Sequence, residues 1–238
     1  TSPYTFASFT WNYQNKATRV TLTSGSYIDY KYLYDGKRFY SVASTGDTYR
    51  RYYIFAGDML IGEIRNTSPY AAYTWGPDGI VSKRDLVGNT SAWYEFGPQG
   101  ETRKLTNGSG AVTDTYYYNA YGETISSSGT TVNPYRYGAK YGYYTETFTS
   151  LILATQRWLA PQLMRWVSRD PIGYKGGVNL YSYVDENPVK WIDPDGLAKC
   201  VYNIRKHILV CKSNDDKTKR NVGPRGVKSG DGKCVNNN

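Results

Sequence analysis

The sequence predicts an all-β protein, and its composition and patterning are the first two observations behind that prediction. Tyr and Gly are abundant, with 26 and 24 copies among 238 residues, whereas Met occurs twice. Aromatic side chains favour pleated surfaces, and glycine supplies the positive φ that tight turns need. Polar and apolar residues alternate in segments such as 92–96 and 103–105, which is typical of strands with one packed face.

A repeat of 21 to 22 residues is the third observation. Gly36, Gly57, Gly79, Gly100 and Gly122 follow one another at intervals of 21, 22, 21 and 22 residues, and an aromatic residue shortly precedes each. Tyrosines recur at the same spacing, at Tyr52, Tyr73, Tyr94 and Tyr116. A second set of glycines, Gly46, Gly88 and Gly110, marks turns about half a period later. We predict one hairpin per period, stacked into a long twisted sheet. An antiparallel sandwich with evenly spaced turns is the alternative.

Charge divides the chain near residue 197. Residues 198–238 contain 10 Lys or Arg and 3 Asp, so they hold +7 of the total net charge of +9. They also contain every cysteine and the single histidine, which are Cys200, Cys211, Cys234 and His207. This asymmetry predicts either a separate module with an anionic partner or a solvated tail. The odd cysteine count fits an incomplete disulfide set or reduced thiols.

No membrane span is expected, and export cannot be judged from the start of this sequence. The most apolar stretch, residues 151–167, is interrupted by Gln and Arg, so it falls short of the roughly 18 apolar residues of a membrane span. Residue 1 is Thr, and residues 1–10 lack the pattern of a signal peptide. We therefore expect a fragment in which no export signal is visible.

The repeated phrases resemble the YD repeats of RHS and teneurin-like proteins between Tyr30 and Gly142. Tyr34-Asp35-Gly36 keeps the literal Tyr-Asp pair, and the other units vary it. The resemblance implies hairpins that wind into part of a hollow β-shell.

After Tyr143 the period ends, and a run that begins at Arg165 resembles the RHS-associated core. Its closing motif is Pro, four residues, Asp-Pro, any residue and Gly-Leu, which matches Pro188, Asp193, Pro194, Gly196 and Leu197. In that family the core is an aspartyl autoprotease that closes the shell and hydrolyses the bond after the leucine. The resemblance therefore implies cleavage between Leu197 and Ala198, with catalytic Asp170 and Asp193 and an essential Arg169.

The residue types present in residues 1–197 agree with a peptidase that uses carboxyl groups. Residues 1–197 contain neither His nor Cys, so no Ser-His or Cys-His nucleophile pair can form there. Two neighbouring carboxyl groups cannot both ionise, which suits one acid and one base acting on an amide. Pro171 and Pro194 stiffen the chain beside the two aspartates, and Gly196 permits a sharp turn. Asp-Pro and Asp-Gly are also ordinary turn formers, which is how we interpret Asp195.

The sequence of the basic tail, residues 198–238, is compatible with more than one activity. Residues 200–211 alternate as strands do, with a turn expected near residues 205–207, and the tail resembles the opening of L,D-transpeptidase-like toxins. We interpret His207 and Cys234 as structural. The ten cations also suit nucleic acid, although Tyr202 is the one aromatic residue left for base stacking.

Together these patterns predict three segments: a shell segment over residues 1–142, a self-cleaving core over 143–197, and the start of a toxin or tail over 198–238. We expect a secreted or delivered bacterial toxin component that encloses its own C-terminal toxin segment and releases it by autoproteolysis. Expected partners are that segment, a second shell or delivery-complex protein, and an immunity protein, with nucleic acid a candidate for the tail alone. No cofactor or metal is expected. The alternative is a non-enzymatic YD-repeat surface or adhesion protein.

Overall fold

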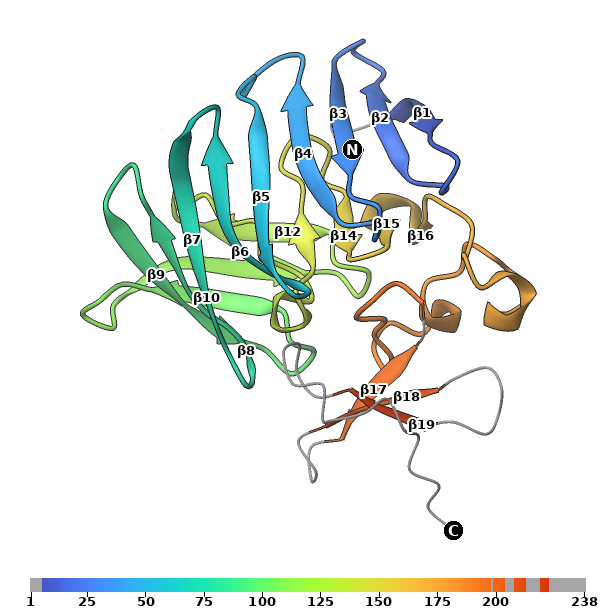
Figure 1. The fold of residues 1–238 in the computed structure, drawn as a ribbon. Helices are drawn as coiled ribbons and strands as arrows, with labels where there is room; N and C mark the ends of the chain where they lie inside the picture. Colours follow the sequence, from blue (N-terminus) through green and yellow to red (C-terminus); the bar gives the residue numbers. More distant parts are fainter. Residues whose placement is uncertain (1–5, 198, 204–207, 213–218, 223–238) are drawn as a thin grey trace.

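The computed structural model describes residues 6–197, 199–203, 208–212 and 219–222, and these residues confirm the all-β prediction (Figure 1). Three antiparallel sheets follow one another along the chain, and in each the strands pair in sequence order. They have twelve, four and three strands. Ala198, His207 and Cys234, which the sequence analysis singled out, lie outside the described residues.

The twelve-stranded sheet is a continuous meander of hairpins from Phe6 to Ser128. Its strands are β1 (Phe6–Trp11), β2 (Ala17–Leu22), β3 (Tyr27–Tyr32), β4 (Arg38–Ala43), β5 (Arg51–Ala56), β6 (Met59–Arg65), β7 (Ser68–Gly76), β8 (Gly79–Asp85), β9 (Thr90–Phe96), β10 (Thr102–Thr106), β11 (Val112–Tyr118) and β12 (Thr124–Ser128).

Four of the five periodic glycines lie in the hairpin turns, as the repeat predicts, and Gly79 begins β8 directly after its turn. All five have positive φ, between +60° and +113°. At Gly36, Gly100 and Gly122 the glycine N–H donates to the carbonyl three residues earlier, at 3.0 to 3.1 Å. The same local conformation therefore recurs once per period because only glycine adopts it without a steric cost.

Tyrosines of the repeat line one face of this sheet. Tyr53, Tyr73, Tyr94 and Tyr116 are buried there. In the first unit the buried residue is Tyr53 rather than the strictly periodic Tyr52. The connection between β6 and β7 is a two-residue turn, shorter than the four residues between β8 and β9, which changes the spacing. Because side chains alternate between faces, a shift of one residue exchanges the buried and exposed positions.

The second sheet lies against that tyrosine-lined face (Figure 1). It consists of β13 (Tyr144–Thr145), β14 (Ile152–Ala154), β15 (Arg157–Ala160) and β16 (Arg165–Trp166). Tyr135, which precedes it, packs edge-on against Tyr73 and Tyr94 at centroid distances of 5.0 and 6.4 Å. The helices of the described chain are the short 3-10 turns η1 (Ala139–Tyr141), η2 (Pro161–Leu163), η3 (Gly173–Gly176) and η4 (Val184–Glu186).

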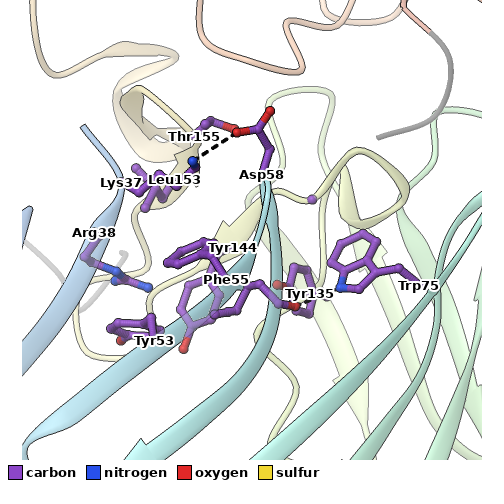
Figure 2. A pocket seen from close by; sticks show the side chains of 12 residues that line it. Lys37, Arg38, Tyr53, Phe55, Asp58, Trp75, Tyr135, Tyr144, Leu153 and Thr155 are labelled. Carbon is purple, nitrogen blue, oxygen red and sulfur yellow. Dashed lines mark hydrogen bonds and ion pairs between the residues drawn. The ribbon is translucent and has the colours of Figure 1, made fainter. Parts of the chain in front are cut away.

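Buried charges fix the two sheets to each other. Arg38 of β4 pairs with Glu146, just after β13, at 2.8 Å, and its guanidinium lies over the rings of Tyr53 and Tyr144 (Figure 2). Glu63 of β6 accepts a hydrogen bond from Tyr144 at 3.2 Å. These contacts orient the small sheet because a buried charge is tolerated only where its partners meet it.

The third sheet, β17 (Cys200–Asn203), β18 (Ile208–Lys212) and β19 (Lys219–Val222), follows the predicted cleavage motif. Its strands agree with the alternation seen at residues 200–211, and the turn expected at 205–207 lies outside the described residues. Cys200 is buried and disulfide-bonded. A two-way backbone bridge between Ile192 and Cys200, at 2.9 and 2.6 Å, connects this sheet to the preceding core.

In the part of the chain that the structure describes, no helix is long and apolar enough to cross a membrane.

The turn glycines provide a stability test with an internal control. Gly57→Ala introduces a side chain at positive φ into open space, so we expect a loss of about 1–2 kcal/mol in the free energy of unfolding. In Gly100→Ala the new Cβ also lies 2.5 Å from the Tyr141 ring. This steric overlap should lower the free energy of unfolding by about a further 1–3 kcal/mol. Urea denaturation of both variants measures the difference. Equal losses of unfolding free energy in the two variants would show that the Tyr141 ring moves aside without cost, which would contradict the close packing at Gly100.

Candidate active site

A buried arginine lies at the centre of the predicted autoproteolytic core. Arg157 opens β15 directly after the tight β14–β15 turn, and it is 3% exposed. Its guanidinium stacks over the ring of Trp166, with 4.4 Å between its carbon and the ring centroid. Trp166 follows in the adjacent strand β16, whose pairing with β15 aligns the two side chains. The stack fixes the plane in which the five N–H donors of the guanidinium point.

Arg157 brings the two predicted catalytic aspartates together. Nη2 donates a hydrogen bond to Oδ2 of Asp193 at 3.1 Å. Nη1 lies 3.0 Å from Oδ2 of Asp170, an ion pair that lacks the alignment of a hydrogen bond. Asp170 and Asp193, which are 23 residues apart in the sequence, therefore contact the same guanidinium. Both carboxyl groups are largely buried, with side-chain exposures of 11% and 4%.

Asp193 also holds the loop that contains the predicted cleavage site. Its Oδ1 accepts the N–H of Leu197 at 2.9 Å, and Oδ1 of Asp195 accepts the same N–H at 3.1 Å. The N–H of Gly196 donates to the Asp193 carbonyl, while the Gly196 carbonyl accepts from Nε of Arg157 at 2.5 Å. Asp193 thus contacts Leu197, the residue that precedes the predicted cleavage point.

Gly196 is required by space as well as by conformation. Its φ is +75°, and a Cβ there would lie 2.8 Å from the carbonyl oxygen of Ala154 on the β14–β15 hairpin. The cleavage loop therefore packs directly on the hairpin that carries Arg157, and a side chain would separate them.

The Tyr143 hydroxyl fixes the main chain of Asp193 from the other side. It donates to the Asp193 carbonyl at 2.6 Å and accepts the Asp193 N–H at 3.1 Å. Burial, together with the charge of Asp193, raises the pKa of Tyr143 well above its ordinary value of 10. The phenol consequently stays protonated at physiological pH and keeps donating.

Asp170 is held by its own turn. Its N–H donates to the carbonyl of Leu180 at 2.9 Å, and its Oδ1 accepts the N–H of Ile172 at 3.0 Å. Oδ2 remains directed at Arg157. Asp170 is thus positioned by the segment after β16, whereas Asp193 is positioned by the segment before β17.

The remaining predicted site residues surround this cluster with different exposures. Pro188, Pro194 and Gly196 are buried, Leu197 is half-buried, and Pro171 and Arg169 are exposed. The Arg169 side chain makes no ion pair among the described residues, and its carbonyl accepts a 3.4 Å hydrogen bond from Asn15. The arginine that contacts both aspartates is Arg157.

Sequence reasoning missed Arg157 and Tyr143. Arg157 did leave a signal, because it interrupts the most apolar stretch of the chain, where an unpaired charge would be costly. Tyr143 is one of 26 tyrosines, and nothing local distinguishes it.

Two cavities of the described structure lie away from this cluster. One of about 40 Å³, lined by Tyr53, Phe55, Trp75, Tyr135 and Tyr144 among others, sits between the two sheets (Figure 2). A second of about 160 Å³ is bordered by Asp47, Arg51 and Glu146. Both are smaller than the roughly 300–1,000 Å³ typical of small-molecule sites. The aspartate pair instead faces a segment of its own chain.

Removing the central arginine tests how far the cluster depends on it. Arg157→Met leaves two buried carboxyl groups without their cation, so we expect unfolding to require about 3–5 kcal/mol less free energy. The matched control is Arg19→Met, which removes an ion pair with Asp29 whose side chains are 43% and 31% exposed, so its loss should be much smaller because water screens exposed charges. Urea denaturation measures both. A similar small loss in the two variants would contradict a central role for Arg157.

No protein-family model matches the chain. Similar proteins are toxins and toxin components. Double-stranded DNA deaminase toxin A of Burkholderia cenocepacia is 29% identical over 169 residues, which are 61% of this chain and 12% of that protein. Toxin subunit YenC2 of Yersinia entomophaga is 35% identical over 127 residues, 51% of this chain and 12% of its own length. The chain thus spans about an eighth of these relatives.

Solved structures share the fold. The crystal structure of TcdB2-TccC3-Cdc42 matches with a TM-score of 0.67 at 22% identity, covering 79% of this chain and 10% of that one. The relatives are thus Rhs- and Tc-toxin-type proteins, and the all-β architecture of this chain is the one found in the Tc-toxin structures.

Proposed function

We propose that this chain is the closing part of a toxin-associated β-shell and that it cuts itself between Leu197 and Ala198. Asp170 and Asp193 form the acid–base pair in this proposal, and Arg157 holds them together. The observation that carries it is the shared guanidinium, combined with the 2.9 Å hydrogen bond from the Leu197 N–H to Asp193. These contacts support a pair that acts on the bond after Leu197, where the motif predicts cleavage.

The chemistry is hydrolysis of one amide. One carboxylate accepts a proton from a water molecule, whose oxygen adds to the carbonyl carbon of Leu197. The other carboxyl group gives its proton to the nitrogen of Ala198, and the carbon–nitrogen bond breaks. The products are a carboxyl group on Leu197 and an amine on Ala198. Catalyst and substrate belong to the same chain, so each molecule reacts once, and proximity replaces substrate binding.

The net charge of the cluster supports one carboxyl group acting as the acid and the other as the base. One guanidinium and two ionised carboxylates would leave a net negative charge in a buried site, which is costly. If one of the carboxyl groups retains a proton, the cluster is neutral. General acid–base catalysis of this kind requires one carboxyl group that carries a proton and one that is ionised.

The wider role follows from the relatives and from the charge of the tail. We propose that the segment starting at Ala198 is the beginning of a toxin, which the shell formed by residues 1–142 and the core formed by 143–197 enclose until release. The relatives include a double-stranded DNA deaminase toxin and a tRNA nuclease, and the net charge of +7 in residues 198–238 suits a nucleic-acid target. The Tc-type structures pair TccC3 with TcdB2, which favours a second shell protein as partner and delivery by a secreted complex. A protein that releases a toxin also needs an immunity partner.

Mass spectrometry with N-terminal sequencing tests the cleavage. We expect the wild-type chain to yield a fragment that starts at Ala198. Asp170→Asn and Asp193→Asn keep the side-chain shape but cannot exchange the proton, so cleavage should slow by at least about 10²-fold. Asp195→Asn is the matched control within the same motif, because its side-chain oxygen still accepts the Leu197 N–H. It should cut at the wild-type rate.

Two other results would replace the proposal. A new terminus at Pro194 would indicate simple scission of the acid-labile Asp193–Pro194 bond. A wild-type chain that stays intact would favour the non-enzymatic alternative, a YD-repeat surface protein whose Asp-Pro turns only close the shell.

A further inference from the structure

The turn between β1 and β2 contacts both segments that carry the site, although it lies about 140 residues away in the sequence. Nζ of Lys16 donates to the carbonyl of Gln156 at 2.7 Å and to its side-chain Oε1 at 2.5 Å. Nδ2 of Asn15 donates to the carbonyl of Arg169 at 3.4 Å. Gln156 immediately precedes Arg157, and Arg169 immediately precedes Asp170. One turn thus holds the main chain next to two members of the cluster.

Local hydrogen bonds define the shape of this turn. The side-chain oxygen of Asn12 accepts the N–H groups of Gln14 and Lys16 at 3.0 and 2.9 Å. The Asn15 N–H donates to the Asn12 carbonyl at 3.0 Å, and Asn15 adopts the left-handed conformation at φ 58°. These local hydrogen bonds fix where the Lys16 side chain starts.

The β3–β4 turn completes the support. Nε2 of Gln156 donates to the carbonyl of Asp35 at 3.5 Å, and Nε2 of Gln14 donates to the carbonyl of Tyr34 at 3.3 Å. A Cβ on Gly36 would lie 2.8 Å from Oε1 of Gln156, so the turn fits closely against that side chain. Gln156 is therefore enclosed by two hairpin turns of the large sheet.

We propose, on the basis of the autoproteolysis proposed above, that Lys16 is a positioning residue for the cleavage. It holds the β14–β15 turn through Gln156 and thereby sets the Arg157 guanidinium against Asp170 and Asp193. Cleavage then depends on the first hairpin of the large sheet being in place. The β1–β2 hairpin must be packed against the β14–β15 turn before the chain is cut, which prevents early loss of the segment after residue 197.

The charge state of Lys16 adds a measurable signature. Burial first, and then the neighbouring charge of Arg157, lower its pKa to about 8, while Asp35 acts in the opposite direction. Asp35 itself pairs with Lys37 at 2.7 Å. Lys16 is thus protonated below about pH 8 and neutral above it. Its hydrogen bonds to Gln156 are charge-assisted only in the protonated form, and such bonds are the stronger kind.

The test follows cleavage of the full chain after a pulse of cell-free synthesis, by the appearance of the fragment that begins at Ala198. Lys16→Met removes the donor, and we expect cleavage to slow by about 10-fold or more, because small misplacements of a catalytic group have large effects on rate. Lys16→Arg keeps a cation and should restore most of the rate. Lys104→Met, at an exposed position on β10, is the control for losing a lysine and should cut as the wild type does.

The pH profile separates positioning from a general loss of stability. As the pH rises through about 8, the wild-type rate should fall relative to that of Lys16→Arg, because arginine stays charged. The positioning role would be overturned if the ratio of the wild-type cleavage rate to the Lys16→Arg rate stayed constant between pH 7 and 9. It would also be overturned if Lys16→Met cut at the wild-type rate. If neither wild type nor Asp193→Asn produces the Ala198 fragment, the autoproteolysis itself fails, which is a distinct outcome.

Discussion

The contact between the Arg157 guanidinium and two buried aspartates is the constraint on which the rest of the core depends. Burying two carboxyl groups side by side is unfavourable unless a cation meets both, and a single planar guanidinium can do so. Each partner comes from a different segment: β15, the turn after β16, and the loop before β17. The cluster therefore ties together three segments that are separate in the sequence.

The large sheet serves this cluster as a scaffold. Its tyrosine-lined face, together with the buried pairs at Arg38 and Glu63, orients the small sheet, and β15 of that sheet presents Arg157. The hairpin turns at the edge of the large sheet reach the residue that precedes Arg157. A repeat architecture is suited to this purpose because each hairpin is positioned by its neighbours. The hairpin turns that contact the site are therefore correctly placed only when the neighbouring hairpins are also folded.

The geometry also suggests why the reaction would be confined to one bond. Asp193 belongs to the loop that would be cut, and its backbone is held by Tyr143 while its side chain is held by Arg157 and the Leu197 N–H. The proposed substrate bond and the residues that would cut it thus belong to one loop and its direct contacts.

The sequence by itself determined the all-β class, the hairpin period and the turn positions, because glycine at positive φ and alternating strands are local properties that recur every 21 to 22 residues. The proximity of Asp170 and Asp193 was an expectation from motif resemblance, and the coordinates place both on one guanidinium. Only the tertiary structure decided that Arg157 rather than Arg169 bridges them, that Tyr53 rather than Tyr52 is buried, and that Lys16 reaches the site. Those outcomes depend on strand register and on contacts between distant segments, and no local pattern encodes which of many similar arginines or tyrosines will meet a given partner.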